Sequence, residues 1–206
     1  LEKSMKISKD FIEEYMKFQP KTILDIGAND GTWLNLFNKT NSECIGVEPS
    51  SRHCVKLREL GVSTFHGYFN EEIVDEITRH LNGKTLDLVT INNTLANVNE
   101  VRKVFELFTK LDTGSTVFSI VTGYHFEQFS AGMYDYIYHE HLSYFSIKDL
   151  SSLAKAFGFT DIRIRKFPLK GGSIQFIFRR GPSDAEYQEE LNRLVQQEIW
   201  YMLNPE

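Results

Sequence analysis

The chain has 206 residues, of which 41% are hydrophobic and 25% charged, a composition that suits one globular domain with a sizeable core. Its formal net charge of −5 argues against nucleic-acid binding, which favours a basic surface. The longest stretch without a charged residue, 113–126, is too short to span a membrane, and the polar first residues show no signal peptide. Cys44 and Cys54 form neither a CxxC pair nor a disulfide framework, so we expect a cytoplasmic protein in which both pack in the core and no cysteines hold zinc.

The first 122 residues alternate between helical and strand patterns. Residues 8–18 are typical of an amphipathic helix with Ser8 as its N-cap, and Pro20 follows them. Short apolar segments then predict strands at 22–26, 43–47, 62–66, 86–92 and 115–122. The helices expected between them lie at 30–38, 50–60, 71–81 and 99–111. This alternation predicts a parallel sheet covered by helices on both faces.

The pattern changes after Thr122. Residues 123–146 are aromatic and poorly periodic, and a helix at 147–157 follows. The segments 160–167 and 173–179 predict an antiparallel hairpin. A last helix begins at a capping box formed by Ser183 and Glu186, and it packs on the sheet, makes a dimer contact or is the start of a further domain.

These elements together predict an α/β fold with a doubly wound, mostly parallel seven-stranded sheet and an antiparallel C-terminal hairpin. We divide the chain into an N-terminal helix (1–20), one main domain (21–182) with an aromatic insert (about 123–146), and a C-terminal helix (183–206). Basic residues cluster near the hairpin, and we interpret them as a solvated face in preference to an anion site: Arg163, Arg165, Lys166, Lys170, Arg179 and Arg180.

A glycine-containing loop follows the first predicted strand. Gly27 permits a tight turn and close approach of a ligand, and the helix behind it offers unpaired N–H groups. A dinucleotide site has G-x-G-x-x-G, whereas here Gly27 and Gly31 are spaced G-x-x-x-G. Asp25 precedes the loop and Asp30 lies within it, so their charges repel a pyrophosphate and suit a zwitterionic or cationic ligand.

An acid also ends the second predicted strand, in Gly46-Val47-Glu48-Pro49. In doubly wound sheets, an acid at this position binds the ribose hydroxyls of a nucleotide. The loop and Glu48 together resemble the cofactor site of class I S-adenosylmethionine methyltransferases. The resemblance predicts S-adenosylmethionine as the cofactor, without a metal, and the following candidate cofactor-binding residues: Asp25, Gly27, Ala28, Asn29, Gly31, Glu48, Pro49, Phe69 and Asn92.

The insert contains Tyr138-His139-Glu140-His141. If this segment is extended, His139 and His141 share one face and Tyr138 and Glu140 the other. The helical H-E-x-x-H spacing of zinc sites is absent, which disfavours metal binding, and packed histidines are the structural alternative. A general base is the interpretation we favour, because histidine titrates near neutral pH and a neighbouring carboxylate raises its basicity.

Five segments, in order, resemble the sugar C-methyltransferase family that acts on nucleotide-linked 4-keto deoxysugars. The matching segments, which span about Thr22 to Arg180, are Leu24–Gly31, Gly46–Ser50, Asn93–Val98, Tyr136–Ser146 and Gly171–Ser173. The string YHEHxSYFS is the most specific of them. The resemblance implies His141 as the base, with Tyr138 and Glu140 assisting as catalytic residues.

The chain also departs from that family. The cysteine-rich zinc module that precedes the cofactor domain in family members and their C-terminal domain are both missing here, and Asn97 stands where many members have histidine. The residues expected to contact the substrate are Asn97, His139, Tyr144 and Lys170. Lys170 and the following glycines could hold a phosphate, although a plain hairpin turn explains them equally well.

Three functions stay open at this point. The first is methyl transfer to a small polar acceptor, a sugar or a nucleotide-linked sugar, without nucleic-acid or membrane partners. The second is O-methylation of a phosphorylated or phosphoramidate-type precursor of surface (capsule) polysaccharide, which the missing C-terminal domain favours. The third is a non-catalytic cofactor-binding subunit of another enzyme. The loop spacing disfavours a nicotinamide oxidoreductase.

Overall fold

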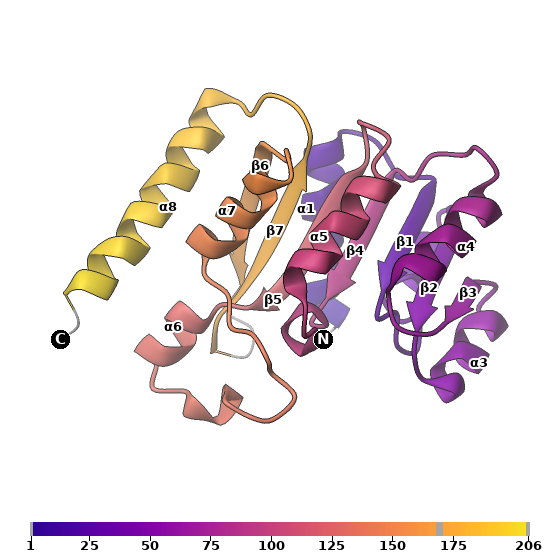
Figure 1. The fold of residues 1–206 in the computed structure, drawn as a ribbon, viewed down its shortest axis with the longest axis horizontal. Coiled ribbons are helices and arrows are strands. Elements are labelled where there is room, and N and C mark those ends of the chain that lie inside the picture. The colour runs from indigo at the N-terminus through magenta and orange to yellow at the C-terminus, as the bar shows by residue number, and fades with distance from the viewer. Residues whose placement is uncertain (1, 168–170, 205–206) are drawn as a thin grey trace.

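The apolar segments build one seven-stranded sheet in the computed structural model, which describes residues 2–167 and 171–204 (Figure 1). In chain order the strands are β1 (Thr22–Ile26), β2 (Glu43–Glu48), β3 (Ser63–His66), β4 (Leu88–Asn92), β5 (Val117–Gly123), β6 (Asp161–Phe167) and β7 (Ser173–Arg179). They lie in the order β3-β2-β1-β4-β5-β7-β6. Strands β1 to β5 pair in parallel, and β7 is antiparallel to both β5 and β6. The predicted fold class is confirmed.

Helices cover both faces of this sheet. The sheet face seen in Figure 1 is covered by α4 (Glu71–Leu81), α5 (Val101–Leu111), α7 (Ile147–Ala156) and α8 (Ala185–Leu203). The other face is covered by α1 (Glu2–Met16), α2 (Asn35–Asn38) and α3 (Ser51–Glu59). The short helices η1 (Leu95–Asn97), α6 (His125–Ser130) and η2 (Tyr134–Tyr136) lie in loops beyond the carboxyl ends of β4 and β5. Both faces of the parallel strands are therefore buried, as their continuous apolar runs require.

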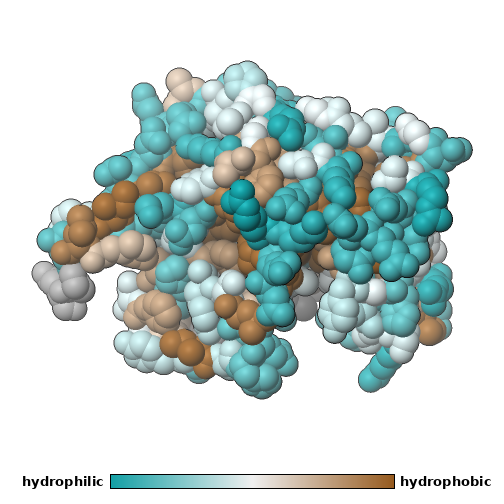
Figure 2. All heavy atoms as spheres, in the orientation of Figure 1, coloured by the Kyte–Doolittle hydropathy of each residue, from teal (hydrophilic) through white to brown (hydrophobic). Residues whose placement is uncertain are grey.

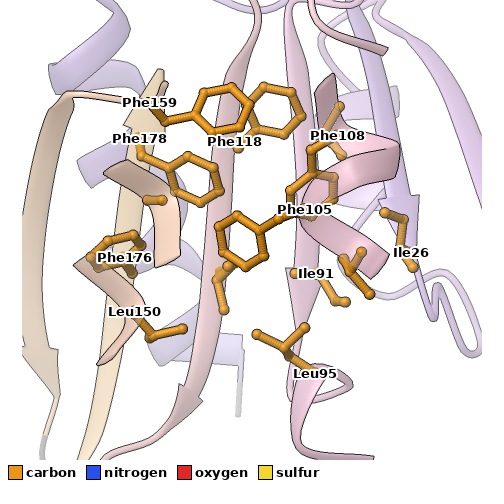
Figure 3. Packing of buried hydrophobic residues seen from close by; sticks show 14 of the residues in the cluster. Ile26, Ile91, Leu95, Phe105, Phe108, Phe118, Leu150, Phe159, Phe176 and Phe178 are labelled. Carbon is orange, nitrogen blue, oxygen red and sulfur yellow. The ribbon is translucent and has the colours of Figure 1, made fainter. Parts of the chain in front are cut away.

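Phenylalanines join the parallel strands to the C-terminal hairpin (Figure 3). The rings of Phe118 on β5 and Phe178 on β7 are stacked with centroids 5.4 Å apart, and Phe105 on α5 stacks on Phe178 at the same distance. All three are fully buried. Such pairs contribute about 1 kcal/mol each beyond the burial of their area, so this cluster fixes β7 beside β5.

Most element bounds follow the sequence pattern, and those of β1, α4 and β7 match it residue for residue. The helix expected at 30–38 is largely wrong, because only Asn35–Asn38 is α-helical. The Asp30 carboxylate accepts hydrogen bonds from the Thr32 N–H at 3.1 Å and from its hydroxyl at 2.7 Å, and Gly31 has φ +80°. This local side-chain bonding gives the backbone a turn in place of the first helical residues.

Both predicted helix caps are also wrong. Helix α1 begins at Glu2, so Ser8 lies in its middle and is buried. Helix α8 has Asp184 at its N-cap position without a side-chain cap bond, and the Ser183 hydroxyl instead accepts a hydrogen bond from Arg163. The hydrogen bond from Arg163 to Ser183 thus takes the place of the expected capping box.

Arg163 corrects the interpretation of the basic cluster as a solvated face. Its side chain is 8% exposed, and its guanidinium donates to Asp161 at 2.8 Å and to Asp184 at 3.0 Å. The buried Asp161 also accepts hydrogen bonds from Tyr15 on α1 and Arg179 on β7. Burial, followed by the bond to Asp161, raises the pKa of Tyr15. This network joins α1, β6, β7 and α8.

The two cysteines are buried, as expected, and burial raises the pKa of Cys44 to about 11. Among the described residues, no helix is long and apolar enough to cross a membrane. Helix α8 packs on the sheet through Leu191 and Leu194, which was one of the three interpretations of this helix. Its outer side carries hydrophobic surface, while the region over α3 and α4 is mostly hydrophilic (Figure 2).

Candidate active site

The glycine loop turns tightly at the carboxyl end of β1. Gly27 has φ +73°, and the N–H groups of Gly27 and Ala28 both donate to the carbonyl oxygen of Val47, at 2.9 and 3.1 Å. A Cβ atom at Gly27 would collide with the side chain of Thr94. The loop is therefore held against the ends of β2 and β4, and it needs glycine for its backbone angle and for this close approach.

Glu48 is anchored at the end of β2 by backbone groups. It is 6% exposed, and its two carboxylate oxygens accept hydrogen bonds from the N–H of Asn29 at 2.9 Å and of Ser50 at 2.8 Å. The His53 imidazole lies 3.7 Å from the same carboxylate. Each ionised oxygen can accept more than one bond, so the carboxylate retains capacity for two ligand hydroxyls.

A cavity of about 580 Å³ opens beside this loop at the carboxyl ends of β1, β2 and β4. Four of the predicted residues line it: Gly27, Pro49, Phe69 and Asn97. Its other walls include four residues that the sequence analysis missed: Tyr68, Thr94, Val98 and Asn99. The mix of apolar walls and a few polar groups suits a nucleoside-sized ligand. Thr94 and Val98 lie in the segment Asn93–Val98, which resembles the sugar C-methyltransferases. This resemblance could have identified both residues from the sequence.

Asp25 lies beneath the loop, outside the cavity wall. The Thr90 hydroxyl donates to its carboxylate at 2.6 Å, the Asn92 amide donates at 3.3 Å, and the Trp33 indole N–H donates to Thr90 at 3.1 Å. Burial raises the pKa of Asp25 to about 7, against the opposing effect of these hydrogen bonds. The carboxyl group therefore carries a variable charge at neutral pH, and a nearby cation favours its ionised form.

The other predicted cofactor residues lie around this loop. Ala28 is buried beside Gly46. A Cβ atom added to Gly46 would lie 3.1 Å from the Cβ atom of Ala28. Gly31 is packed against Leu57 of α3 and against Leu60, which follows α3. Asn29 is exposed and meets Glu48 through its backbone N–H. Ala28 and Gly31 thus shape the loop from behind.

The YHEH segment forms a turn, which corrects the expected extended geometry. The His141 N–H donates to the Tyr138 carbonyl oxygen at 3.0 Å, and the Tyr138 hydroxyl lies 3.0 Å from His141 Nε2. Their rings are 4.3 Å apart. Tyr138 and His141 therefore share a face, while His139 and Glu140 lie exposed at the corner of the turn.

Backbone hydrogen bonds join the residues that follow this turn to Ala96, next to the cavity wall. The N–H groups of Leu142 and Ser143 donate to the Ala96 carbonyl oxygen at 2.8 and 3.1 Å, and Ala96 adjoins Asn97 of the cavity wall. The Tyr144 ring lies 6.0 Å from that of His141. The structure thus brings Tyr138, His141 and Tyr144 together outside the residues that line the cavity, and Ala96 links their segment to Asn97 of the cavity wall, whereas Lys170 lies outside the described residues.

The sequence matches a methyltransferase domain family over residues 4–164. The chain belongs to this methyltransferase family. It is also 26% identical over 177 residues to the C-methyltransferase NovU of Streptomyces niveus, an alignment that covers 85% of the chain and 41% of NovU. The chain therefore spans about two fifths of the length of this relative.

Solved structures share the fold of this methyltransferase. A SAM-dependent methyltransferase from Archaeoglobus fulgidus is 17% identical with a TM-score of 0.66, covering 85% of this chain and 94% of the other. The 1,6-didemethyltoxoflavin-N1-methyltransferase of Burkholderia thailandensis, solved with S-adenosylhomocysteine, is 15% identical with a TM-score of 0.61, covering 87% and 78%. The chain thus contains a methyltransferase domain, and its fold is shared by solved S-adenosylmethionine-dependent methyltransferases.

Proposed function

We propose that this methyltransferase binds its cofactor in the cavity beside the glycine loop, with Glu48 on the ribose hydroxyls. The fixed carboxylate and the room that Gly27 leaves support this placement. Pro49 and Phe69 flank the nucleoside from the cavity wall. Asp25 and Asn92 hold the loop and β4 together and place a carboxylate near the cationic end of the cofactor.

We further propose that the acceptor is a small polar molecule, a sugar or nucleotide-linked sugar, that is methylated at carbon with His141 as general base. The observation that carries this proposal is the pair of Tyr138 and His141, 3.0 Å apart in a segment that is hydrogen-bonded to Ala96, next to the cavity wall. The name of NovU, a C-methyltransferase, supports carbon as the acceptor atom. The exposed aromatic side chains of the insert suit the apolar faces of a sugar ring, and we place the protein in carbohydrate biosynthesis in the cytoplasm.

The mechanism assigns one step to each side chain. The cofactor supplies an electrophilic methyl group when it is bound. His141 Nε2 takes a proton from the carbon beside the acceptor carbonyl, since imidazole titrates near neutral pH. The hydroxyl of Tyr138 or the amide of Asn97 donates to the enolate oxygen that forms. The cofactor, held by the glycine loop and Glu48, would supply its methyl group to the electron pair on this carbon and would keep the methyl–sulfur bonding pair on its sulfur.

The remaining candidate residues have supporting roles in this proposal. Tyr138 and Glu140 assist the base, Tyr138 through its hydroxyl and Glu140 through its charge beside His141. Tyr144 and His139 contact the acceptor, and Lys170 contacts its phosphate if one is present. Much of the rate then comes from holding the acceptor carbon in line with the methyl group and the sulfur.

Deuterium exchange tests the base directly. The protein is incubated in D₂O with S-adenosylhomocysteine and a nucleotide-linked 4-keto deoxysugar, and incorporation beside the carbonyl is followed by mass spectrometry. We expect exchange with the wild type and a rate at least about 100-fold lower with His141→Ala, because a general base contributes about this much. Binding of S-adenosylhomocysteine is expected to be equal in both proteins.

Two results contradict the carbon-methylation proposal. Equal exchange in the two proteins removes His141 as the base. The absence of exchange in the wild type, together with consumption of S-adenosylmethionine on hydroxyl-bearing phosphorylated acceptors, supports O-methylation instead. The matched control is His125→Ala, because His125 lies in the same insert but its Nδ1 contacts the Phe145 carbonyl oxygen at 2.6 Å.

A further inference from the structure

Two glycines that directly precede β7, Gly171 and Gly172, lie against the insert. The N–H of Tyr124, which joins β5 to α6, donates to the Gly172 carbonyl oxygen at 3.0 Å. This bond fixes the point at which the insert leaves the sheet, beyond the end of β5 (Figure 1). Both glycines have positive φ angles, +74° for Gly171 and +132° for Gly172. The function proposed above gives these two residues no role.

Side chains of the insert occupy the space that side chains at these two positions would need. A Cβ atom added to Gly171 would collide with the sulfur atom of Met133, and one added to Gly172 would lie 2.6 Å from the Cβ atom of Glu127. Met133 is half-buried, whereas the residues on either side of it are exposed. Gly171 and Gly172 therefore form a glycine socket, in which Met133 and Glu127 are seated.

A phosphate bound at these glycines is the competing explanation for their presence. The Glu127 carboxylate lies so close to Gly172 that its Oε2 atom would be 3.0 Å from an added Cβ atom. Its Oε1 atom pairs with Lys166 of β6 at 3.1 Å, which is a second tether between α6 and the hairpin. Because a carboxylate at this place repels a phosphate, packing of the insert explains the two glycines better than anion binding.

Aromatic rings connect the seated residues to His141. Phe129 on α6 lies with its ring centroid 6.5 Å from that of Tyr144, and the Tyr144 ring lies 6.0 Å from that of His141. Tyr134, the residue after Met133, stacks on Phe129 at 6.3 Å. Because packed side chains transmit a displacement to their neighbours, a shift of α6 or of Met133 moves the rings that adjoin the proposed base.

We propose that Gly171 and Gly172 are positioning residues for His141, and that they act by seating the insert through Met133 and Glu127. The inference rests on the proposed role of His141 as general base. A misplacement of about 1 Å that arises far from the reacting atoms can lower a rate about 100-fold. Neither glycine belongs to the residues that line the cofactor cavity, so filling the socket should affect the base and spare cofactor affinity.

Alanine substitutions that fill the socket test this inference. Deuterium exchange into the nucleotide-linked 4-keto deoxysugar and calorimetry with S-adenosylhomocysteine are combined with NMR of the His141 imidazole, whose signals are assigned with His141→Ala. We expect Gly171→Ala and Gly172→Ala to slow exchange at least about tenfold and to shift the His141 signals and their pH titration. The affinity for S-adenosylhomocysteine should stay within about twofold of wild type.

The matched control is Gly132→Ala. Gly132 lies in the same insert with φ +68°, but an added Cβ atom meets no atom within 4 Å, so this variant carries backbone strain without a collision. Its exchange rate and His141 signals should match wild type within about twofold. Met133→Ala empties the socket without straining a glycine and should also shift the His141 signals. Adding Gly171→Ala to Met133→Ala should slow exchange by less than about a further threefold, because the collision is then absent.

Three results overturn the inference. The first is unchanged His141 signals in the two socket variants and in Met133→Ala. The second is an equal effect of Gly132→Ala, which assigns the change to backbone strain. The third is a parallel loss of S-adenosylhomocysteine affinity, which assigns it to the fold as a whole. Absence of exchange in the wild type instead overturns the proposed base, and the His141 signals still decide whether the socket positions this side chain.

Discussion

The two halves of the candidate site are built in opposite ways. Around the glycine loop, Glu48 and Asp25 are buried, and their carboxylates accept hydrogen bonds from neighbouring strands and loops, with the His53 imidazole of α3 also 3.7 Å from Glu48. In the insert, Tyr138 is 41% exposed and Tyr134 is 67% exposed. The N–H groups of Leu142 and Ser143, which follow the turn, donate to the Ala96 carbonyl oxygen beyond β4. The cofactor half is preorganised by the sheet, whereas the acceptor half is a surface loop positioned by few contacts.

The largest effect that separates the halves is expected from Asp25→Asn. Burial raises the pKa of Asp25 to about 7 in the folded protein, well above the ordinary value of 3.8 for an exposed aspartate. As pH rises from 4 to 7, the Asp25 carboxyl group loses its proton in the unfolded chain but keeps it in the folded protein. Rising pH therefore favours the unfolded chain, and the free energy of unfolding of the wild type falls. The free energy of unfolding of Asp25→Asn relative to wild type should increase by about 4 kcal/mol between pH 4 and pH 8.

Urea unfolding at several pH values measures this difference. Asp30→Asn is the control, since the hydrogen bonds from Thr32 lower the pKa of Asp30, so its removal should not produce the same trend. A pH-independent difference between Asp25→Asn and wild type would show that Asp25 stays ionised beneath the loop.

Glu198→Ala is expected to disturb the insert and spare the cofactor half. The Glu198 carboxylate is buried and accepts hydrogen bonds at 2.8 Å from the Tyr124 hydroxyl and from the N–H groups of Ile147 and Lys148. Its removal leaves these donors unpaired and should lower the free energy of unfolding by about 3 kcal/mol. The affinity for S-adenosylhomocysteine should change less than about threefold, which calorimetry at low temperature measures. A large loss of affinity would mean that the halves are coupled.

Glu48→Ala is expected to affect cofactor binding first. Loss of the bonds to two ribose hydroxyls should weaken S-adenosylhomocysteine about 100-fold, which corresponds to about 3 kcal/mol. Glu43→Ala at the other end of β2 removes an exposed acid that pairs with Lys84 and serves as the control. Unchanged affinity in Glu48→Ala, measured by calorimetry, would place the ribose elsewhere.

The smallest effect is expected from Tyr138→Phe. The variant keeps the ring beside His141 and removes the hydroxyl 3.0 Å from Nε2. We expect deuterium exchange to slow about fivefold and its pH profile to shift, since one neutral hydrogen bond contributes about 1 kcal/mol. Tyr134→Phe, an exposed tyrosine of the same insert, should match wild type. Identical pH profiles for wild type and Tyr138→Phe would remove the hydroxyl from the mechanism.

Features set by local pattern could be predicted from the sequence. Strand β1 and helix α4 have the bounds that their apolar periodicity predicts, and Glu48 lies at the end of β2, where the strand pattern puts it. The mostly parallel sheet and the antiparallel C-terminal hairpin were likewise predicted from the alternation of strand and helix patterns. Gly27 and Pro49 could be found in the same way, as residues that follow strand ends.

Features set by contacts between distant segments could not be predicted. Ser8 looked like a helix cap, because nothing local shows that α1 begins six residues earlier and faces β7. The turn at Tyr138–His141 depends on backbone bonds to Ala96, which lies more than forty residues away in the chain. Arg163 looked solvated because its partner Asp184 belongs to another element.

The ends of the insert are joined to each other more firmly than its middle is joined to the sheet. Tyr124 and Phe145 form a β-bridge, and Glu198 binds both the Tyr124 hydroxyl and the Ile147 N–H. A loop whose ends are already closed can change in length and composition at little entropic cost. Residues 126–144 are thus an exchangeable cassette, and transplanting other loops between these two ends offers a way to redirect the enzyme to new acceptors while its cofactor chemistry is kept.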